Sequence, residues 1–385
     1  MQVLFALSLM FVAQTTPESA PAATTVTGAI EPTETEILLE HITQAKSLLS
    51  DAKIGTARLG GQNAVLAVWN PSDPDGIRLV RVQGAMSRTS GFKVKLMEQN
   101  GVNTRYEVTE PTGYIVLAIK TNVLAGRYVY GRKRHWHASG RTKTAIYVPY
   151  SDALRRPEIV EAGRQYLIGL TDSAAARLDR QNVKSLLDPE KLVSETVPER
   201  VLITLLVIEH VDPGDFDRLG ARAMADMVLT MVAVNREDTF MYSFSPAGAG
   251  GMAQFINTTY RLTRARYPGA QLQPDFLAGM RDHVNAVMAQ YCLADWSLAK
   301  LPADKVRQLS EGLNEEDLGA YLAAAYNGGE SRAAEAYLKS PDDWEKPNHG
   351  LYAETVTYVR EFRAIYGHLF GSQDEPGPPY PPFRP

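Results

Sequence analysis

The chain has 385 residues, of which 44% are hydrophobic and 22% are charged, and its formal net charge is −4. These proportions are typical of a soluble globular protein and exclude a largely disordered or membrane-spanning chain. The length exceeds that of one compact helical domain and favours two domains with tails.

The N-terminal segment predicts export. Residues Val3 to Ala13 (VLFALSLMFVA) form an apolar run that is too short to span a bilayer, and a polar, proline-containing segment follows it. We interpret residues 1–25 as a signal peptide and polar leader; the alternative is a tail with an apolar start. The single cysteine, Cys292, allows neither a disulfide within the chain nor a lipid anchor after the run. We therefore expect an exported protein of the periplasm or cell envelope, with no membrane-spanning segment beyond the signal.

The next part of the sequence predicts a helix and then a β-rich domain. Residues 26–53 contain apolar positions at helical spacing from Glu34 to Lys53. Residues 54–150 contain short runs rich in Val, Ile and Tyr, separated by turn signals such as Asn100-Gly101. The seven runs are AVLAVW, IRLVRV, FKVKLM, TRYEVT, YIVLAI, RYVYGR and TAIYVPY. This pattern predicts a small antiparallel, sandwich-like domain of unknown role.

A basic block lies within the β-rich domain. Its cationic and histidine residues alternate with the aromatic residues Tyr128, Tyr130 and Trp136. The block consists of Arg127, Arg132, Lys133, Arg134, His135, His137, Arg141 and Lys143. Such a block could bind an anionic wall polymer, nucleic acid or a protein partner, and a solvated hairpin is the alternative.

Beyond residue 150 the pattern is helical, so the predicted fold class is α+β. We divide this half into a helical connector (151–196), an all-α domain (197–370) and a Pro-rich disordered tail (371–385). Helices are predicted from Val197 to about His210, from Leu219 to Arg236, after Thr258, and over Phe276–Lys300, Asn314–Leu338 and Glu354–Leu369.

Three motifs in the helical half point to a function. They are Ser245 to Tyr260 (SPAGAGGMAQFINTTY), Ala325 to Gly329 (AYNGG) and Glu354 to Val359 (ETVTYV). Glycines beside a glutamine suit a backbone that closely approaches a bulky ligand. In this order the motifs resemble those of the lytic transglycosylases, lysozyme-like enzymes that cut bacterial peptidoglycan. The resemblance covers residues 197–366.

The resemblance implies a lysozyme-like domain that binds peptidoglycan glycan strands and needs no metal or cofactor. It implies substrate contacts beside the scissile sugar, along the glycan groove and at the cleft wall. The residues concerned are Ser245, Gln254, Tyr326, Asn327, Glu354 and Tyr358. The chain departs from the family pattern at Met252-Ala253, where many members have Leu-Met, and at His210, where the family has Ser.

Two glutamates are candidates for the catalytic acid, Glu209 after VLITLLVI and Glu237 after MVLTMVAVNR. Cleavage requires a carboxylic acid that stays protonated near neutral pH, and the C-terminal end of a buried helix favours this state. The Val197-Pro198 pair before the first helix resembles the family's catalytic helix and favours Glu209. The short spacing to Gly248 favours Glu237, because Gly248 lies 11 residues after Glu237 and 39 after Glu209. We prefer Glu209 and keep Glu237 as the alternative.

In the implied reaction a single glutamate acts as acid and then as base. It cleaves the β-1,4 bond between N-acetylmuramic acid (MurNAc) and N-acetylglucosamine (GlcNAc), and leaves a 1,6-anhydroMurNAc end. One alternative is a lysozyme-type hydrolase that uses water as nucleophile. The other is a non-catalytic peptidoglycan-binding or structural wall protein.

Overall fold

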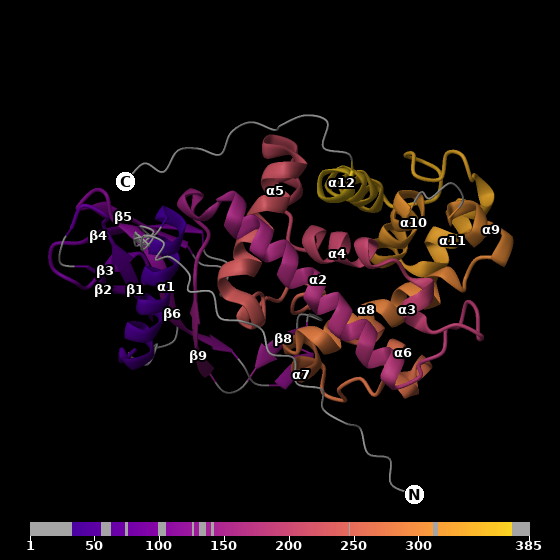
Figure 1. Cartoon of the computed structure of the whole chain (residues 1–385), viewed down its shortest axis with the longest axis horizontal. Helices are drawn as coiled ribbons and strands as arrows, with labels where there is room; N and C mark the ends of the chain where they lie inside the picture. The colour runs from indigo at the N-terminus through magenta and orange to yellow at the C-terminus, as the bar shows by residue number, and fades with distance from the viewer. Residues whose placement is uncertain are drawn as a thin grey trace, which may run out of the picture.

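The computed structural model describes residues 33–54, 63–73, 76–98, 105–124, 127–130, 136–139, 142–245, 247–310 and 315–371. An antiparallel β-rich region is followed by a helical C-terminal region, and the two lie side by side (Figure 1). The predicted signal segment and the Pro-rich tail after Gly371 lie outside the described residues. So do the side chains of the predicted basic block, apart from Lys143.

The strands are β1 (Asn63–Trp69), β2 (Arg78–Gln83), β3 (Met86–Ser87), β4 (Lys93–Glu98), β5 (Arg105–Glu110), β6 (Ile115–Leu124), β7 (Arg127–Tyr130), β8 (Trp136–Ser139) and β9 (Thr142–Tyr147). The α-helices are α1 (Glu34–Asp51), α2 (Pro157–Arg180), α3 (Val193–Thr196), α4 (Glu199–Ile208), α5 (Pro213–Asn235), α6 (Asn257–Arg266), α7 (Phe276–Arg281), α8 (His283–Leu298), α9 (Ala303–Ser310), α10 (Glu315–Gly328), α11 (Glu330–Lys339) and α12 (Ala353–Phe370). Each of the seven predicted runs overlaps one of these strands.

The β-rich region is built on a five-stranded antiparallel sheet with the strand order β3-β2-β1-β6-β9. In the central strand β1, Leu66 lies opposite Val80 of β2 and Ile119 of β6. Helix α1 packs on one face of the sheet, and the β4–β5 pair packs on the other. The six residues after Asn63 are buried because both faces are covered. The expected second sheet is therefore represented by the β4–β5 pair on one face only.

Helix α4 lies at the centre of the helical region, among α2, α10 and α12 (Figure 1). All eight residues from Val201 to Ile208 are buried, which explains why the helix is apolar on every side. Helix α5 stands between the β-rich region and the other helices, and its chain breaks from helical geometry at Gly220.

Two of the predicted helices are interrupted in the structure. The predicted helix over Phe276–Lys300 is divided into α7 and α8 at Asp282, whose side chain accepts a hydrogen bond from the Asn285 amide (3.0 Å) and caps α8. The predicted helix over Asn314–Leu338 is divided into α10 and α11 at Gly329, where φ is 91°. In both cases one residue ends the helix while the hydrophobic period continues.

The two regions are joined through buried contacts. Ile159 of α2 and Val234 of α5 belong to the same hydrophobic cluster as α1 and the sheet. The Asn235 side chain accepts a hydrogen bond from the Val148 amide (2.8 Å) and donates one to the Val148 carbonyl (3.0 Å). Lys46 of α1 donates to the Val234 carbonyl (2.8 Å). These bonds fix the end of β9 against the end of α5.

Replacing Asn235 by Ala should lower the free energy of unfolding by about 2–3 kcal/mol. The reason is that the buried amide and carbonyl of Val148 would each lose a hydrogen-bond partner. Urea unfolding followed by circular dichroism measures the change. The matched control is Gln308→Ala on the exposed side of α9, which should change stability by less than about 0.5 kcal/mol.

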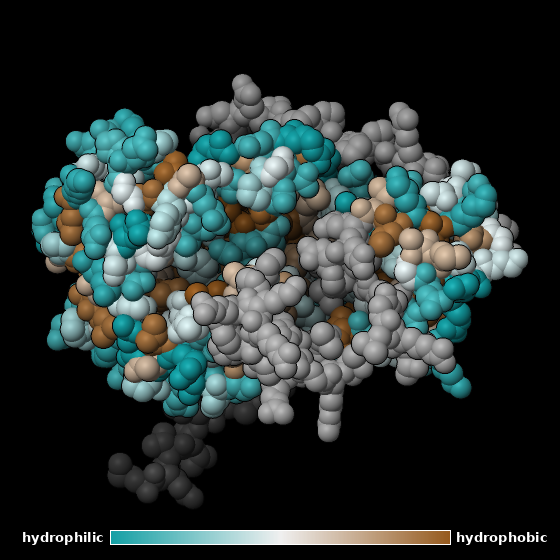
Figure 2. Space-filling model, turned by 180° about the vertical axis from the view of Figure 1, so that it is seen from behind, coloured by the Kyte–Doolittle hydropathy of each residue, from teal (hydrophilic) through white to brown (hydrophobic). Residues whose placement is uncertain are grey.

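The described surface is mixed in character. On the face shown in Figure 2, hydrophobic residues appear in separate small areas between hydrophilic ones. Among the described helices, none combines the length and the apolar character needed to cross a bilayer.

Candidate functional site

Glu209 ends helix α4 as its C-cap residue and is half-buried. The hydroxyl of Tyr358, from α12, donates a hydrogen bond to its Oε1 atom. Burial raises the pKa of Glu209 to about 7, and the hydrogen bond from Tyr358 acts in the opposite direction by stabilising the carboxylate. The carboxyl group is therefore close to half-protonated at neutral pH, as a group that both donates and accepts a proton should be.

A second tyrosine connects this position to the Gly-rich segment. The hydroxyl of Tyr326, near the end of α10, donates a hydrogen bond to the carbonyl of Ala253. Burial raises the pKa of the Tyr326 and Tyr358 hydroxyls well above the ordinary value, so both remain hydrogen-bond donors at neutral pH. Residues from all three predicted motifs thus meet beside Glu209.

The Gly-rich segment packs without room for larger residues. A Cβ atom at Gly250 would overlap the ring of Phe244, and one at Gly251 would overlap the carbonyl of Met280. Gly251 also has a φ of 70°, which side chains other than hydrogen disfavour. These two glycines are therefore required by the packing of the segment.

Ser245 and Gln254, predicted to contact the substrate, brace this segment in the structure. The Ser245 hydroxyl accepts a hydrogen bond from the Ala249 amide (3.0 Å). The Gln254 side chain donates to the Gly251 carbonyl (2.7 Å), and its backbone has a positive φ of 46°. Both side chains are half-buried, so each has one side toward solvent.

Asn327 and Glu354 lie farther toward the solvent. Both are exposed, and Asn327 accepts a hydrogen bond from the hydroxyl of Thr355 (2.7 Å), which links α10 to α12. Glu354 lies in the first turn of α12, one turn before Tyr358. Their contact with a substrate therefore stays a prediction.

The two candidate glutamates have different surroundings. Glu237 is exposed on a short 3₁₀ helix, Arg236–Asp238, that follows α5. The charges near it include those of Lys46 in α1, on the side of the junction with the β-rich region. The structure thus brings Glu209 together with Tyr326 and Tyr358 and leaves Glu237 apart from them.

His210 has a role in the site that sequence reasoning missed. Its ring stacks on that of Phe240 with the centroids 3.5 Å apart, and its Nε2 atom lies 2.8 Å from the Met252 carbonyl. Burial lowers the pKa of His210 to about 4, so the ring is neutral at neutral pH. Because a carbonyl only accepts, Nε2 carries the proton. The one signal for this residue in the sequence was its position directly after Glu209.

Glu361 carries a buried carboxyl group close to Tyr358. It lies one turn after Tyr358 on α12, with 3% of its surface exposed, and burial raises its pKa to about 7. Sequence reasoning missed it because it lies between Arg360 and Arg363 and resembles an exposed, charged helix face.

In the part of the chain that the structure describes, no group of three or more His, Cys, Asp or Glu side chains is placed to hold a metal ion. Comparison of the chain with models of protein families, with curated proteins and with solved structures finds no match.

Proposed function

We propose that this protein is a peptidoglycan lytic transglycosylase. The observation that carries the proposal is that Glu209 bonds to Tyr358 and lies close to Tyr326, which in turn bonds to the Gly-rich segment, although the motifs are far apart in the chain. In this proposal residues 197–370 form a lysozyme-like domain, and the leader directs the protein to the periplasm or cell envelope.

In the first step Glu209 transfers a proton to the oxygen of the MurNAc–GlcNAc bond. The bond between this oxygen and C1 of MurNAc breaks, and GlcNAc leaves with a 4-hydroxyl group. Tyr358 holds Oε1, so Oε2 is the oxygen that carries the proton to the substrate. A pKa of about 7 leaves a large protonated fraction at neutral pH. As the proton leaves, the Tyr358 hydroxyl stabilises the carboxylate that forms.

In the second step the carboxylate of Glu209 takes the proton of the muramoyl C6 hydroxyl. The C6 oxygen then bonds to C1, so the 1,6-anhydro ring closes and Glu209 regains its proton. Gly250 and Gly251 let the Gly-rich segment pack closely against Phe244 and Met280, and Tyr326 holds this segment against α10 through Ala253. One carboxyl group is sufficient for both steps.

Mass spectrometry of purified peptidoglycan digested by the protein tests the proposal. Release of anhydromuropeptides is the expected result. Products with reducing MurNAc ends instead would identify a hydrolase, and no release by the folded protein would identify a binding or structural wall protein.

Replacing Tyr358 by Phe should move the alkaline limb of the pH–rate profile to higher pH by roughly half a pH unit to one pH unit. Activity requires protonated Glu209 and falls as the pH rises through its pKa. The hydrogen bond from Tyr358 lowers this pKa, so its loss raises the pKa further. The profile of kcat/KM against pH measures the shift. Tyr352→Phe, at an exposed tyrosine, is the control, and a shift to lower pH would contradict the assignment.

A further inference from the structure

The junction between the β-rich region and α5 contains three adjoining cavities. One, of about 150 Å³, lies between α5 and the β-rich region and is lined by His210. It shares Arg105, Pro149 and Tyr150 with a groove of about 690 Å³ along β5 and the start of β6. A third, of about 230 Å³, shares Met231 with the first. We call these three cavities together the junction trough.

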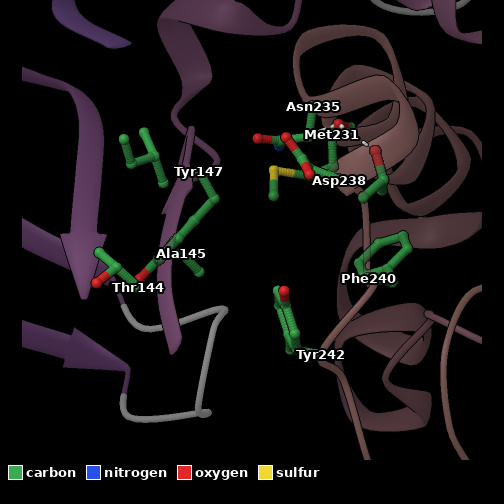
Figure 3. A pocket seen from close by; sticks show the side chains of 10 residues that line it. Thr144, Ala145, Tyr147, Met231, Asn235, Asp238, Phe240 and Tyr242 are labelled. Atoms are coloured by element: carbon green, nitrogen blue, oxygen red, sulfur yellow. Dashed lines mark hydrogen bonds between the residues drawn. The ribbon is translucent and has the colours of Figure 1, made fainter. Parts of the chain in front are cut away.

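Figure 3 shows the third cavity from close by. Thr144, Ala145 and Tyr147 of β9 form one wall, and Asp238 and Tyr242 lie opposite with the end of α5. The hydrogen bonds between Asn235 and Val148 hold the two walls together. The trough is therefore a fixed feature of the packing between the two regions.

The chemistry of the trough suits a short peptide. Methionines of α5 line the first cavity, and methionine side chains adapt to small apolar groups of different shape. Asp212 and Asp215 at the start of α5 supply negative charge, and Arg105 on the opposite wall supplies positive charge. A ligand that alternates methyl groups with carboxylates and an ammonium group complements this lining. The methionines are Met224, Met227 and Met231.

The same lining is less suited to a sugar ring. The ring of Phe240 is already stacked on His210 at 3.5 Å, so that face cannot stack on a sugar. The hydroxyl of Tyr150 already donates a hydrogen bond to Asp152 (3.0 Å). Sugar binding commonly relies on open aromatic faces with polar groups beside them.

The trough extends to the residue that follows the proposed catalytic acid in the chain. In peptidoglycan the peptide is attached to MurNAc, the sugar whose bond Glu209 would protonate. His210 is the residue next to Glu209 and lines the first cavity. An extended peptide advances about 3.3–3.6 Å per residue, so a stem of four or five residues is long enough to span roughly 13–18 Å from its sugar.

We propose that the junction trough binds the stem peptide of peptidoglycan, so that the β-rich region contributes one wall of the substrate site. This inference rests on the proposed function. It gives the β-rich region a role, which is to favour glycan strands that carry peptides.

The test compares two substrates with the full chain: glycan strands that carry stem peptides, and the same strands stripped of peptides by an amidase. The unmutated protein should cleave the first with a kcat/KM about 10-fold higher. Met227→Trp, which fills the first cavity, should lower this preference about 10-fold, and so should Tyr150→Ala. The matched control is Met86→Trp on the exposed strand β3, which should leave the preference unchanged. A preference that survives in both folded trough variants would overturn the proposal.

A binding experiment separates this inference from the proposed function. Calorimetry measures the affinity of a soluble stem pentapeptide for the Glu209→Gln protein, with and without Met227→Trp. One outcome is that the unmutated protein cleaves neither substrate, while the peptide binds about 10-fold more weakly to the double variant than to the Glu209→Gln protein. In that case the trough assignment stands and the transglycosylase proposal fails. If anhydromuropeptides are released but the peptide does not bind and the two substrates are cleaved equally, the transglycosylase proposal stands and the trough assignment fails.

Discussion

Replacing Glu209 by Gln should lower the rate of anhydromuropeptide release by roughly 10³-fold, within the range of proton transfer by a positioned acid and base. The amide keeps the size of the side chain and its contact with Tyr358 but cannot carry the proton. Glu237→Gln is the matched control, because Glu237 is exposed and apart from the tyrosines, and it should change the rate less than twofold. Quantitative mass spectrometry of the products over time measures both rates. The reverse pattern would move the catalytic role to Glu237.

The free energy of unfolding of the Glu209→Gln variant should also depend on pH in a way that distinguishes loss of the proton donor from loss of the fold. The pKa of Glu209 is about 7 in the folded chain and 4.5 as its ordinary value. A raised pKa contributes stability that is present below about pH 4.5 and is lost as the pH rises through about 7. At pH 8 the glutamine variant should therefore be more stable than the parent by on the order of 2 kcal/mol, and at pH 4 the two should unfold together. A variant that is inactive and less stable at pH 8 would contradict this account.

Replacing Asp295 by Ala should lower the free energy of unfolding by about 3–5 kcal/mol. Asp295 is fully buried on α8, and its carboxylate accepts hydrogen bonds from four donors. They are the amide of Leu186 (2.7 Å) and the hydroxyls of Tyr267 (2.6 Å), Thr196 (2.7 Å) and Ser185. In the alanine variant the four donors lose their shared hydrogen-bond acceptor, and the missing side-chain atoms leave a cavity. Guanidinium unfolding at pH 7 measures the loss.

Asp172→Ala is the control for this prediction, because Asp172 lies on the exposed face of α2. It should change stability by less than about 0.5 kcal/mol. Equal unfolding midpoints for the two variants would mean that the four hydrogen bonds contribute little. We expect a large loss of stability for Asp295→Ala because its hydrogen bonds connect α3 and the loop before it to α8.

Local patterns in the sequence were sufficient to locate most elements. Runs rich in Val, Ile and Tyr identified seven of the nine strands in the described residues and missed the short strands β3 and β8. The hydrophobic spacing did not predict the ends of α7 and α10, because it continues past both. Asp282 ends α7 by capping α8, and Gly329 ends α10 by its positive φ. The hydrophobic spacing also could not foresee that α1 would cover the face of the sheet where a second sheet was expected.

The candidate site was partly predictable in the same sense. The order of the three motifs identified Tyr326 and Tyr358, and in the structure Tyr326 bonds to the Gly-rich segment and Tyr358 to Glu209. The choice between the glutamates depends on burial, which two similar apolar helices cannot reveal. Glu361 was missed for the same reason, because its burial arises from the packing of α12 and not from its neighbours in sequence.

The cluster that Ile159 and Val234 share with the β-rich region has a consequence for how this protein can vary. The helical half, released from the sheet by truncation near residue 150, would present these side chains to water. We expect such a fragment to aggregate unless both positions become polar. The β-rich half therefore cannot be exchanged like an independent module, and relatives that lack it should carry polar residues at both positions.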